Sequence, residues 1–312
     1  MQTVIEVQGL SKSYGKKEVI KGINFQVNKQ EILCFLGPNG AGKSTTINLL
    51  IGALKADSGT INHNNQSIHN DLNTYKSLLG IVPQDLAIYE ELSAEKNINF
   101  FASLYGLKGQ ELKQACQFAL EFCGLKEHAK DKVKTFSGGM KRRLNIACAI
   151  AHKPELLIMD EPTVGIDPQS RNHILEGVKQ LKDQGMTILY TTHYMEEAEE
   201  IADRVIIMDL GTIITTGSVD SLKAEINNER RYQISITENP EFDCKQLYGI
   251  KGVKEINYIN NTFTIYTDKK TENLDKIITL LINHKIAIKD INCQAANLET
   301  VFLKLTGKSL RD

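Results

Sequence analysis

The chain has 312 residues, of which 41% are hydrophobic and 24% charged, a composition that fits one large globular domain and a smaller one. Its formal net charge of −1 gives no support for a nucleic acid as a partner, and no apolar run approaches the roughly 18–20 residues of a membrane helix. Because the N-terminal residues also lack a signal-peptide pattern, we expect a cytoplasmic protein that meets the membrane only through a partner.

The first part of the chain is predicted to be rich in β-strands. Residues 3–8 alternate between apolar and polar side chains and indicate an edge strand. Residues 19–20 and 23–27 indicate two further short strands. The wholly apolar run Ile32–Leu36 predicts a buried strand, which leads into the most informative stretch of the sequence.

A glycine-rich turn follows this strand and precedes an amphipathic helix. Its residues are Gly37, Pro38, Asn39, Gly40, Ala41, Gly42, Lys43, Ser44 and Thr45. Between a strand and a helix, such a turn points its backbone N–H groups around a phosphate chain, and its glycines allow positive φ angles. Lys43 supplies a positive charge to the terminal phosphates, and the Ser44 hydroxyl can bind Mg²⁺. The sequence therefore predicts a nucleoside triphosphate site.

Helical periodicity dominates residues 93–152, which we interpret as a helical insertion into the core. Within this block, Ser137-Gly138-Gly139 precedes a long helix that runs to Ala151. A serine and exposed N–H groups at the start of a helix form an anion-binding site. The alternative, that Ser137 simply caps the helix, is compatible with that role.

Two more apolar runs, Leu156–Met159 and Thr187–Tyr190, predict buried strands with a helix between them. This alternation predicts an α/β fold with a mostly parallel sheet covered on both faces. The carboxyl ends of parallel strands face the ligand crevice, so Asp160 is placed to hold Mg²⁺ and Glu161 to face an attacking water. The alternative is that the two acids cap a helix. The second strand ends close to His193.

A second domain is predicted after the polar residues 227–231, which divide the chain into domains of residues 1–224 and 225–312. Its predicted elements are strand 232–236, helix 240–248, strands 253–258 and 263–266, helix 273–284 and strand 286–291. This β-α-β-β-α-β order, with a turn at Asn260-Asn261, is that of a ferredoxin-like α+β unit. A final amphipathic helix starts at Leu298. No residue cluster indicates catalysis there, and we expect this domain to support dimerisation or regulation.

Several motifs together resemble those of an ATP-binding cassette (ABC) ATPase over about residues 3–220. In chain order they are Gly37–Thr45, Gln84, Ser137–Gly139, Leu156–Glu161, Gly165–Asp167 and His193. Residues 136–143 and 297–307 are similar to the drug, antibiotic and peptide export branch of bacterial ABC proteins. For the second of these segments, the alternative is a helix that packs on its own domain.

The resemblance implies a role for each matching residue. Tyr14 would stack on adenine, with a buried tyrosine at a strand edge as the alternative. Gln84 would contact Mg²⁺ or its water and report the nucleotide state to a partner. Glu161 would be the general base that polarises the water, and His193 would contact the γ-phosphate. Together with Lys43, these residues form the implied catalytic set.

The resemblance also implies a dimer. Ser137-Gly138-Gly139 would face the γ-phosphate held by another subunit, with Asp167 at the same junction, so that a homodimer or a pair with a similar subunit buries two ATP molecules. The chain would then be the ATP-hydrolysing motor of an exporter that drives a separate transmembrane permease. The alternatives are a soluble ABC ATPase acting on ribosomes or DNA, and a regulatory cassette that binds ATP without hydrolysing it. The transported cargo has no signature in these residues.

Overall fold

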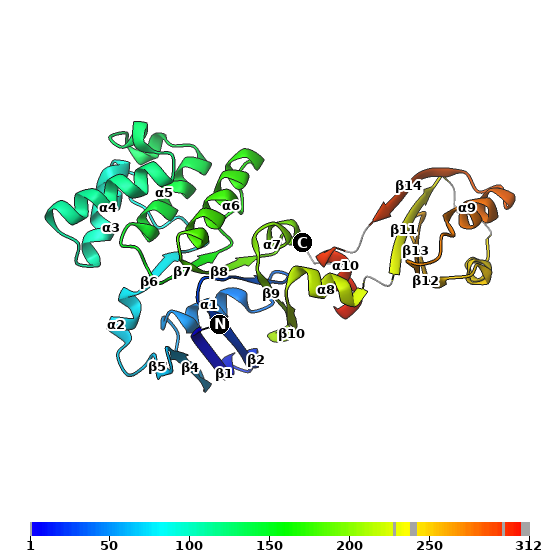
Figure 1. The fold of residues 1–312 in the computed structure, drawn as a ribbon, viewed down its shortest axis with the longest axis horizontal. Coiled ribbons are helices and arrows are strands. Elements are labelled where there is room, and N and C mark those ends of the chain that lie inside the picture. The colour runs from blue at the N-terminus through cyan, green and yellow to red at the C-terminus, as the bar shows by residue number, and fades with distance from the viewer. Residues whose placement is uncertain (1, 227–228, 238–241, 295–296, 307–312) are drawn as a thin grey trace. The chain divides into compact units, whose positions relative to one another are not determined.

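The structure is a computed structural model that describes residues 2–226, 229–237, 242–294 and 297–306. The chain divides into two compact units, with the division between Ser218 and Val219 (Figure 1). The domain boundary predicted at residues 224 and 225 stays a prediction. Residues 227–228, which belong to the polar segment behind that prediction, lie outside the described part of the chain.

The first sheet is antiparallel and has the strand order β2-β1-β4-β5. Its strands are β1 (Thr3–Tyr14), β2 (Lys17–Asn28), β4 (Ser58–His63) and β5 (Gln66–Ser67). The prediction of an edge strand over residues 3–8 is wrong, because β1 is longer and lies between β2 and β4. Gly9 and Gly22 have positive φ angles of 57° and 65°, and the register shifts after Val7. Such bulges interrupt the alternation, so each strand looks shorter in the sequence than it is.

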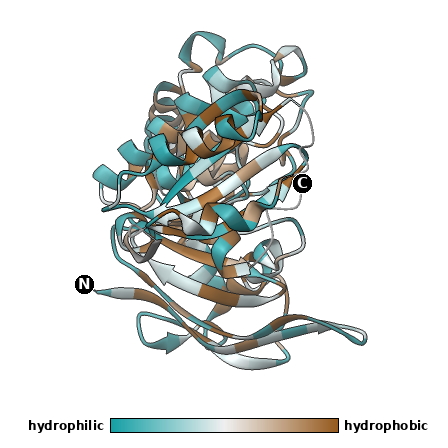
Figure 2. Cartoon of the chain, turned by 90° about the vertical axis from the view of Figure 1, so that its right-hand side faces the viewer, coloured by the Kyte–Doolittle hydropathy of each residue, from teal (hydrophilic) through white to brown (hydrophobic). Residues whose placement is uncertain are grey.

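The central sheet has the order β10-β9-β3-β8-β7-β6 and is parallel except for the β9–β10 pair. Its strands are β3 (Ile32–Leu36), β6 (Leu79–Val82), β7 (Leu156–Asp160), β8 (Thr187–Thr192), β9 (Arg204–Asp209) and β10 (Thr212–Gly217). Every residue of β3, β7 and β8 is buried, as expected of parallel strands covered on both faces. The predicted mostly parallel α/β sheet is confirmed, and Figure 2 shows hydrophobic stretches along its strands.

Helices complete the first unit. The helices outside the helical block are α1 (Lys43–Leu50), α2 (Leu72–Ser77), α6 (Pro168–Asp183) and α7 (Met195–Ile201). The block predicted over residues 93–152 is helical, as expected, and forms the green helices at the upper left of Figure 1. Its elements are α3 (Ala94–Leu104), α4 (Gly109–Phe122), η1 (Lys126–His128), η2 (Val133–Thr135) and α5 (Gly138–Ile150).

The second unit contains an antiparallel sheet of order β12-β13-β11-β14, which is the strand order of a ferredoxin-like fold. Its elements are α8 (Val219–Ile226), β11 (Glu229–Ile236), η3 (Cys244–Gly249), β12 (Val253–Ile259), β13 (Thr262–Asp268), α9 (Leu274–Asn283), β14 (Ile288–Gln294) and α10 (Leu298–Thr306). The helix predicted over 240–248 is instead the short 3₁₀ helix η3, and residues 238–241 lie outside the description. The predicted turn is confirmed, because Asn260 and Asn261 both have positive φ angles.

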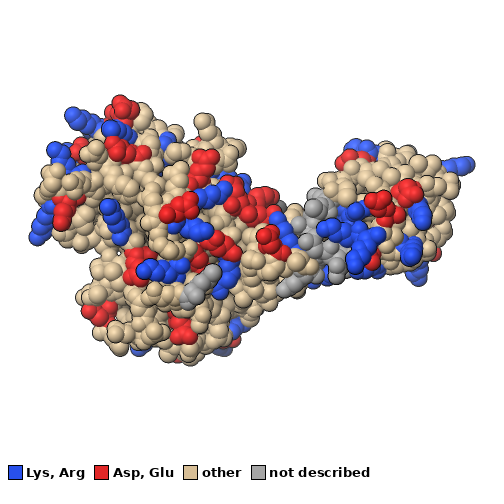
Figure 3. All heavy atoms as spheres, viewed as in Figure 1, with Lys and Arg blue, Asp and Glu red and all other residues tan. Residues whose placement is uncertain are grey.

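Neither sign of charge dominates the visible face of the first unit. On the face shown in Figure 3, basic and acidic side chains are interspersed across its surface. Among the residues that the structure describes, no helix combines the length and the apolar character that a membrane crossing requires.

Candidate functional site

The loop from Gly37 to Gly42 connects β3 to α1 and follows the carboxyl end of a buried strand. Gly42 caps α1 with a φ of 109° and Gly40 has a φ of 81°, so both occupy the left-handed region that glycine enters without strain. A Cβ at Gly37 would lie 2.2 Å from the carbonyl oxygen of Met208 in β9, so a larger residue does not fit there. The loop thus presents the start of α1 as an anion-binding end.

Lys43, the first residue of α1, folds back over this loop. Its Nζ donates to the carbonyl oxygens of Gly37 at 2.7 Å and Pro38 at 3.2 Å. The same Nζ lies 2.9 Å from Oε1 of Glu161, and the two side chains are only 4% and 6% exposed. A cation with acceptors on several sides, buried beside the loop, is a fixed positive charge that phosphate oxygens can also reach.

A hollow beside the loop gathers most of the predicted phosphate-binding residues. Its lining residues are Val19, Asn39, Gly40, Gly42, Lys43, Ser44, Thr45, Gln84 and Glu161. The structure therefore brings Gln84, from the segment after β6, and Glu161, from the end of β7, to the phosphate loop. Gly37, Pro38 and Ala41 belong to the loop but do not line the hollow.

The carboxylates of the two acids at the end of β7 have different partners, although both residues also contact Thr191. Oδ1 of Asp160 accepts from the hydroxyl of Thr191 at 2.6 Å. Glu161 has a positive φ of 47°, and its N–H donates to the Thr191 hydroxyl at 3.0 Å. Neither acid caps a helix, because the next helix, α6, starts at Pro168 and is capped by Asp167. The helix-cap alternative is therefore wrong, and the backbone turn directs the Glu161 carboxylate back toward Lys43.

His193 completes a line of charged and polar groups. Its Nδ1 lies 3.0 Å from Oε2 of Glu161, while Oε1 of the same carboxylate lies 2.9 Å from Nζ of Lys43. An ionised carboxylate has only acceptors, so Nδ1 of His193 is the donor in this contact. The imidazole is one-quarter exposed, at 26%, so it faces both the acid and the solvent. The structure thus brings together three of the predicted catalytic residues, because Lys43 and His193 both contact the carboxylate of Glu161.

Ser137, Gly138 and Asp167 lie elsewhere, outside the lining of this hollow. Ser137 and Gly138 are exposed at the start of α5, where the Ser137 hydroxyl accepts from the N–H of Met140 at 3.2 Å. Asp167 caps α6 by accepting from the N–H of Ser170 at 2.9 Å, and hydrogen bonds from Ser170 lower its pKa. Ser137 and Asp167 are therefore exposed helix caps. Their roles toward a second subunit stay predictions.

Gly139, the third residue of the same motif, is buried. A Cβ at this position would lie 2.1 Å from the hydroxyl oxygen of Ser170, so the glycine allows the start of α5 to approach the start of α6. Two helix N-termini thereby lie close together.

Tyr14 stands at the end of β1 and is 50% exposed. The alternative of a buried tyrosine at a strand edge is therefore wrong. The ring does not line the hollow, so its stacking on adenine stays a prediction.

Sequence reasoning missed Arg142, which links α5 to the segment that carries Gln84. Its Nη1 donates to the carbonyl oxygen of Pro83 at 2.9 Å, and its Nη2 donates to that of Gln84 at 2.7 Å. Arg142 is 5% exposed, and burial lowers its pKa. In the sequence it stands between Lys141 and Arg143, and no local pattern distinguishes the buried basic residue from its neighbours.

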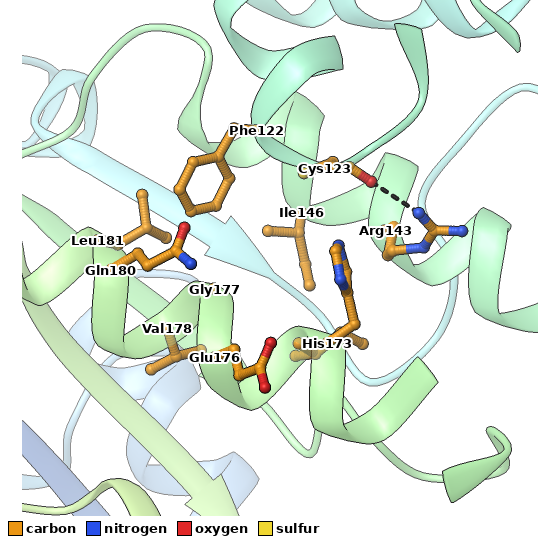
Figure 4. A pocket seen from close by; sticks show the side chains of 11 residues that line it. Phe122, Cys123, Arg143, Ile146, His173, Glu176, Gly177, Val178, Gln180 and Leu181 are labelled. Carbon is orange, nitrogen blue, oxygen red and sulfur yellow. Dashed lines mark hydrogen bonds between the residues drawn. The ribbon is translucent and has the colours of Figure 1, made fainter. Parts of the chain in front are cut away.

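A second pocket lies between the end of α4, α5 and α6 (Figure 4). Phe122, Ile146 and Leu181 supply apolar walls, and Arg143 donates to the carbonyl oxygen of Cys123 at 2.9 Å. None of the predicted site residues lines this pocket. It therefore lies apart from the hollow beside the phosphate loop.

Comparison with known proteins places the chain in a family. A family model described as ABC transporter matches residues 20–164. The linearmycin resistance ATP-binding protein LnrL of Bacillus subtilis is 44% identical over 99% of this chain and 100% of its own length. A Nod factor export ATP-binding protein I of Ralstonia nicotianae is 32% identical over 99% of this chain and 95% of its own length. A solved ATP-binding subunit of an ABC transporter superposes with a TM-score of 0.65 at 32% identity, covering 71% of this chain and 92% of that one. The chain therefore belongs to the ATP-binding proteins of the ABC transporter family.

Proposed function

We propose that this chain is the ATP-hydrolysing subunit of an exporter, acting as a dimer on a separate transmembrane permease at the cytoplasmic face of the membrane. The observation that carries the proposal is the Glu161 carboxylate, held between Lys43 and His193 at the edge of the phosphate-loop hollow. This arrangement sets a general base beside a phosphate-binding cation, which is the requirement of phosphoryl transfer to water.

The donor set fits a triphosphate. Gly40 and Gly42 leave the backbone N–H groups at the start of α1 uncovered by side chains, and Lys43 adds a buried positive charge. ATP phosphates would compete with the Glu161 carboxylate for Nζ of Lys43, because both are anions. Binding of the substrate would thereby free the carboxylate to take a proton.

The residues also fit Mg²⁺, a cation that prefers oxygen ligands. Ser44 and Gln84 line the hollow, and Asp160 is 8% exposed at the adjoining end of β7. We expect these three side chains to hold the ion, directly or through water. Bound there, Mg²⁺ would neutralise charge on the phosphates.

For hydrolysis, Glu161 would accept a proton from the attacking water as the water oxygen bonds to the γ-phosphorus and the bond to ADP breaks. His193 would hold the carboxylate through Nδ1 and turn its other edge toward the γ-phosphate. Gln84, which also lines the hollow, would orient the water or the ion. The roles of Lys43 and His193 both depend on their contacts with the Glu161 carboxylate.

A second subunit would complete the site. Ser137 and Gly138 are exposed at the start of the 13-residue helix α5, and Asp167 caps the nearby start of α6. An exposed helix N-terminus outside its own hollow is available to the γ-phosphate held by another subunit. One copy of each motif per chain supports a homodimer or a pair with a similar subunit.

We propose that the permease docks on exposed apolar side chains beside the Gln84 segment. Leu86, Tyr89 and Phe100 are 39%, 50% and 40% exposed, and the rings of Tyr89 and Phe100 lie 5.2 Å apart. Exposed aromatic residues that adjoin one another are typical of a protein contact. Arg142 links this segment to α5 by a hydrogen bond to the carbonyl oxygen of Gln84. A movement of Gln84 during the ATP cycle would therefore displace the residues that contact the permease.

The names of relatives, which refer to linearmycin resistance and Nod factor export, support export as the direction of transport.

For the second unit, whose core is formed by residues such as Tyr232, Phe263 and Ile277, we propose a role in supporting the dimer or in regulation. Truncation before Glu229 should then weaken dimerisation or alter turnover, and an unchanged truncated protein would contradict this role.

Phosphate release from ATP tests the enzymatic part. The wild-type protein should hydrolyse ATP, and Lys43→Ala should lose nucleotide binding because the buried cation is gone. Lys55→Ala, at an exposed position after α1, is the matched control. Docking on the permease is tested separately. The amount of tagged chain recovered in the membrane fraction is compared between the wild type and Tyr89→Asp. If the wild-type chain hydrolyses ATP but never associates with membranes, the exporter proposal fails and a soluble ABC ATPase is favoured.

A further inference from the structure

Glu197 in α7 is a fully buried carboxylate, at 0% exposure, that no motif marks. Its Oε1 accepts from the hydroxyl of Thr163 at 2.7 Å and forms an ion pair with Arg171, whose Nε lies 2.8 Å away. Its Oε2 accepts from the hydroxyls of Tyr190 at 2.9 Å and Thr192 at 2.8 Å. These partners come from three segments of the chain, namely the turn after β7, helix α6 and strand β8, and they converge on one side chain.

This arrangement suits a carboxylate that carries its charge. Burial of an ion is costly unless hydrogen bonds and an opposite charge replace water, and here the Arg171 guanidinium and three hydroxyl groups do so. Burial together with the neighbouring Glu197 raises the pKa of Tyr190, so its hydroxyl keeps its proton and donates.

The partners of Glu197 are neighbours of the proposed catalytic groups. Thr163 follows Glu161 by two residues, and Thr192 directly precedes His193. The carboxylate of Glu161 and Nδ1 of His193 are 3.0 Å apart. Glu197 therefore holds the residues beside both members of this pair through hydrogen bonds to Thr163 and Thr192.

Arg171 extends the network to the helix that Asp167 caps. Its guanidinium carbon lies 5.1 Å from the centre of the Tyr194 ring, and that ring lies 4.1 Å from the imidazole of His193. The N–H of Tyr194 also donates to the hydroxyl of Thr192 at 2.9 Å. The first turn of α6 and the segment that carries His193 are thus held together by the same groups.

We infer that Glu197 is a positioning residue for ATP hydrolysis, which holds the Glu161–His193 pair in register and ties it through Arg171 to the start of α6. This inference rests on the proposed ATPase function. Its consequence is a separation of effects: Lys43 and the loop make no contact with Glu197, so ATP binding should not depend on it. The chemical step should depend on it, because small displacements of reacting groups are costly.

The first test compares Glu197→Gln with Glu196→Gln, a matched control at the exposed neighbouring position of the same helix. We expect Glu197→Gln to lower kcat by about 10- to 100-fold while KM for ATP stays within about twofold, since a misplacement of about 1 Å can cost 10²-fold. Glu196→Gln should match the wild type. Thermal unfolding, measured on the same samples, sets an assay temperature at which each variant is folded.

A second pair of variants decides the matter if Glu197→Gln does not fold. Thr163→Val removes one donor to Glu197 at nearly constant volume, and Thr163→Ser keeps that donor. If Glu197 positions the pair, kcat should fall in the valine variant and be largely restored in the serine variant, with KM unchanged in both. Equal kcat values for the two variants, or a fall in kcat matched by loss of ATP binding, would overturn it. A wild-type protein that does not hydrolyse ATP at all would count against the proposed function instead.

Discussion

Lys43 and Glu161 form a buried ion pair, with Nζ and Oε1 2.9 Å apart and both side chains almost fully enclosed. The pair joins the phosphate loop to the end of β7, two segments more than a hundred residues apart in the sequence. A buried pair of this kind contributes less to stability than its distance suggests, because desolvation offsets the attraction. Its main effect is on position. It holds the Lys43 ammonium where phosphate can bind and the Glu161 carboxylate where the attacking water would stand.

Glu161→Gln separates these two roles. The amide cannot accept the proton of the attacking water, so turnover should fall by about 10²–10⁴-fold. ATP binding should be retained, because the neutral amide competes less with the phosphates for Lys43, and the ATP-bound dimer should accumulate. Phosphate release, nucleotide titration and sedimentation measure the three effects. Glu111→Gln, at an exposed position of α4, is the control. Turnover at the wild-type rate in Glu161→Gln would sink the assignment of the base.

Gly37→Ala tests how closely the loop is built against β9. The added Cβ would lie 2.2 Å from a carbonyl oxygen of Met208, a backbone atom that cannot move without distorting the sheet. We expect the variant to lose about 2–4 kcal/mol of unfolding free energy, in the range of severe core substitutions. Gly138→Ala, where a Cβ would meet nothing within 4 Å, should keep the wild-type stability. Urea unfolding of both variants makes the comparison, and equal stabilities would contradict the packing seen at Gly37.

The phosphate loop could be predicted because its information is local: a strand, three glycines and a lysine lie within a few residues of one another. The same holds for Asp160 and Glu161, which follow a strand of buried residues. Glu197 could not be predicted, because Met195–Ile201 contains several acids and only the packing selects the buried one. The network around it depends on contacts between residues up to 34 positions apart.

The strand errors have a similar origin. Bulges at Gly9 and Gly22 shift the register of β1 against β2, and a side-chain pattern with period two does not survive such a shift. In the second unit, the turn at Asn260 was predictable because asparagine tolerates positive φ. The short 3₁₀ helix η3 was not, because Cys244–Gly249 carries little helical periodicity.

We expect His152 to make the stability of the first unit depend on pH. The ring stacks on Tyr105 with a centroid distance of 3.5 Å, and Nε2 lies 3.0 Å from the carbonyl oxygen of Leu79. Burial lowers the pKa of His152, so the unfolded chain binds this proton more readily than the folded one. The unfolding free energy should therefore decrease as pH falls below about 6.5, the ordinary value for histidine.

The measurement is urea unfolding of the wild type and His152→Gln at pH 7.5 and 5.5. The variant should show a smaller loss of stability on acidification, because it lacks the group whose protonation favours the unfolded chain. His69→Gln, at an exposed position, is the matched control. Identical losses in the wild type and His152→Gln would show that other groups carry the acid sensitivity.

Arg142 provides the last prediction, because it connects the start of the helix that Ser137 caps with the segment of Gln84. Arg142→Met leaves the carbonyl groups of Pro83 and Gln84 without their donors, which should cost about 1–3 kcal/mol of stability. Turnover should fall further than ATP affinity, since the affected segment positions Gln84 rather than the phosphate loop. Arg142→Lys should recover only part of both losses, because an ammonium keeps the positive charge but lacks the planar fork with which the guanidinium reaches both carbonyl oxygens.

The control for Arg142 is its neighbour Lys141, which pairs with Glu90 at 2.6 Å near the surface. Lys141→Met should change stability by less than about 1 kcal/mol, as expected of a partly exposed ion pair. Steady-state ATPase assays, nucleotide titration and urea unfolding measure these effects. The losses of turnover and stability should increase in the order Lys141→Met, Arg142→Lys, Arg142→Met. If Arg142→Met instead keeps wild-type turnover, the link between α5 and Gln84 is structural and takes no part in the catalytic cycle.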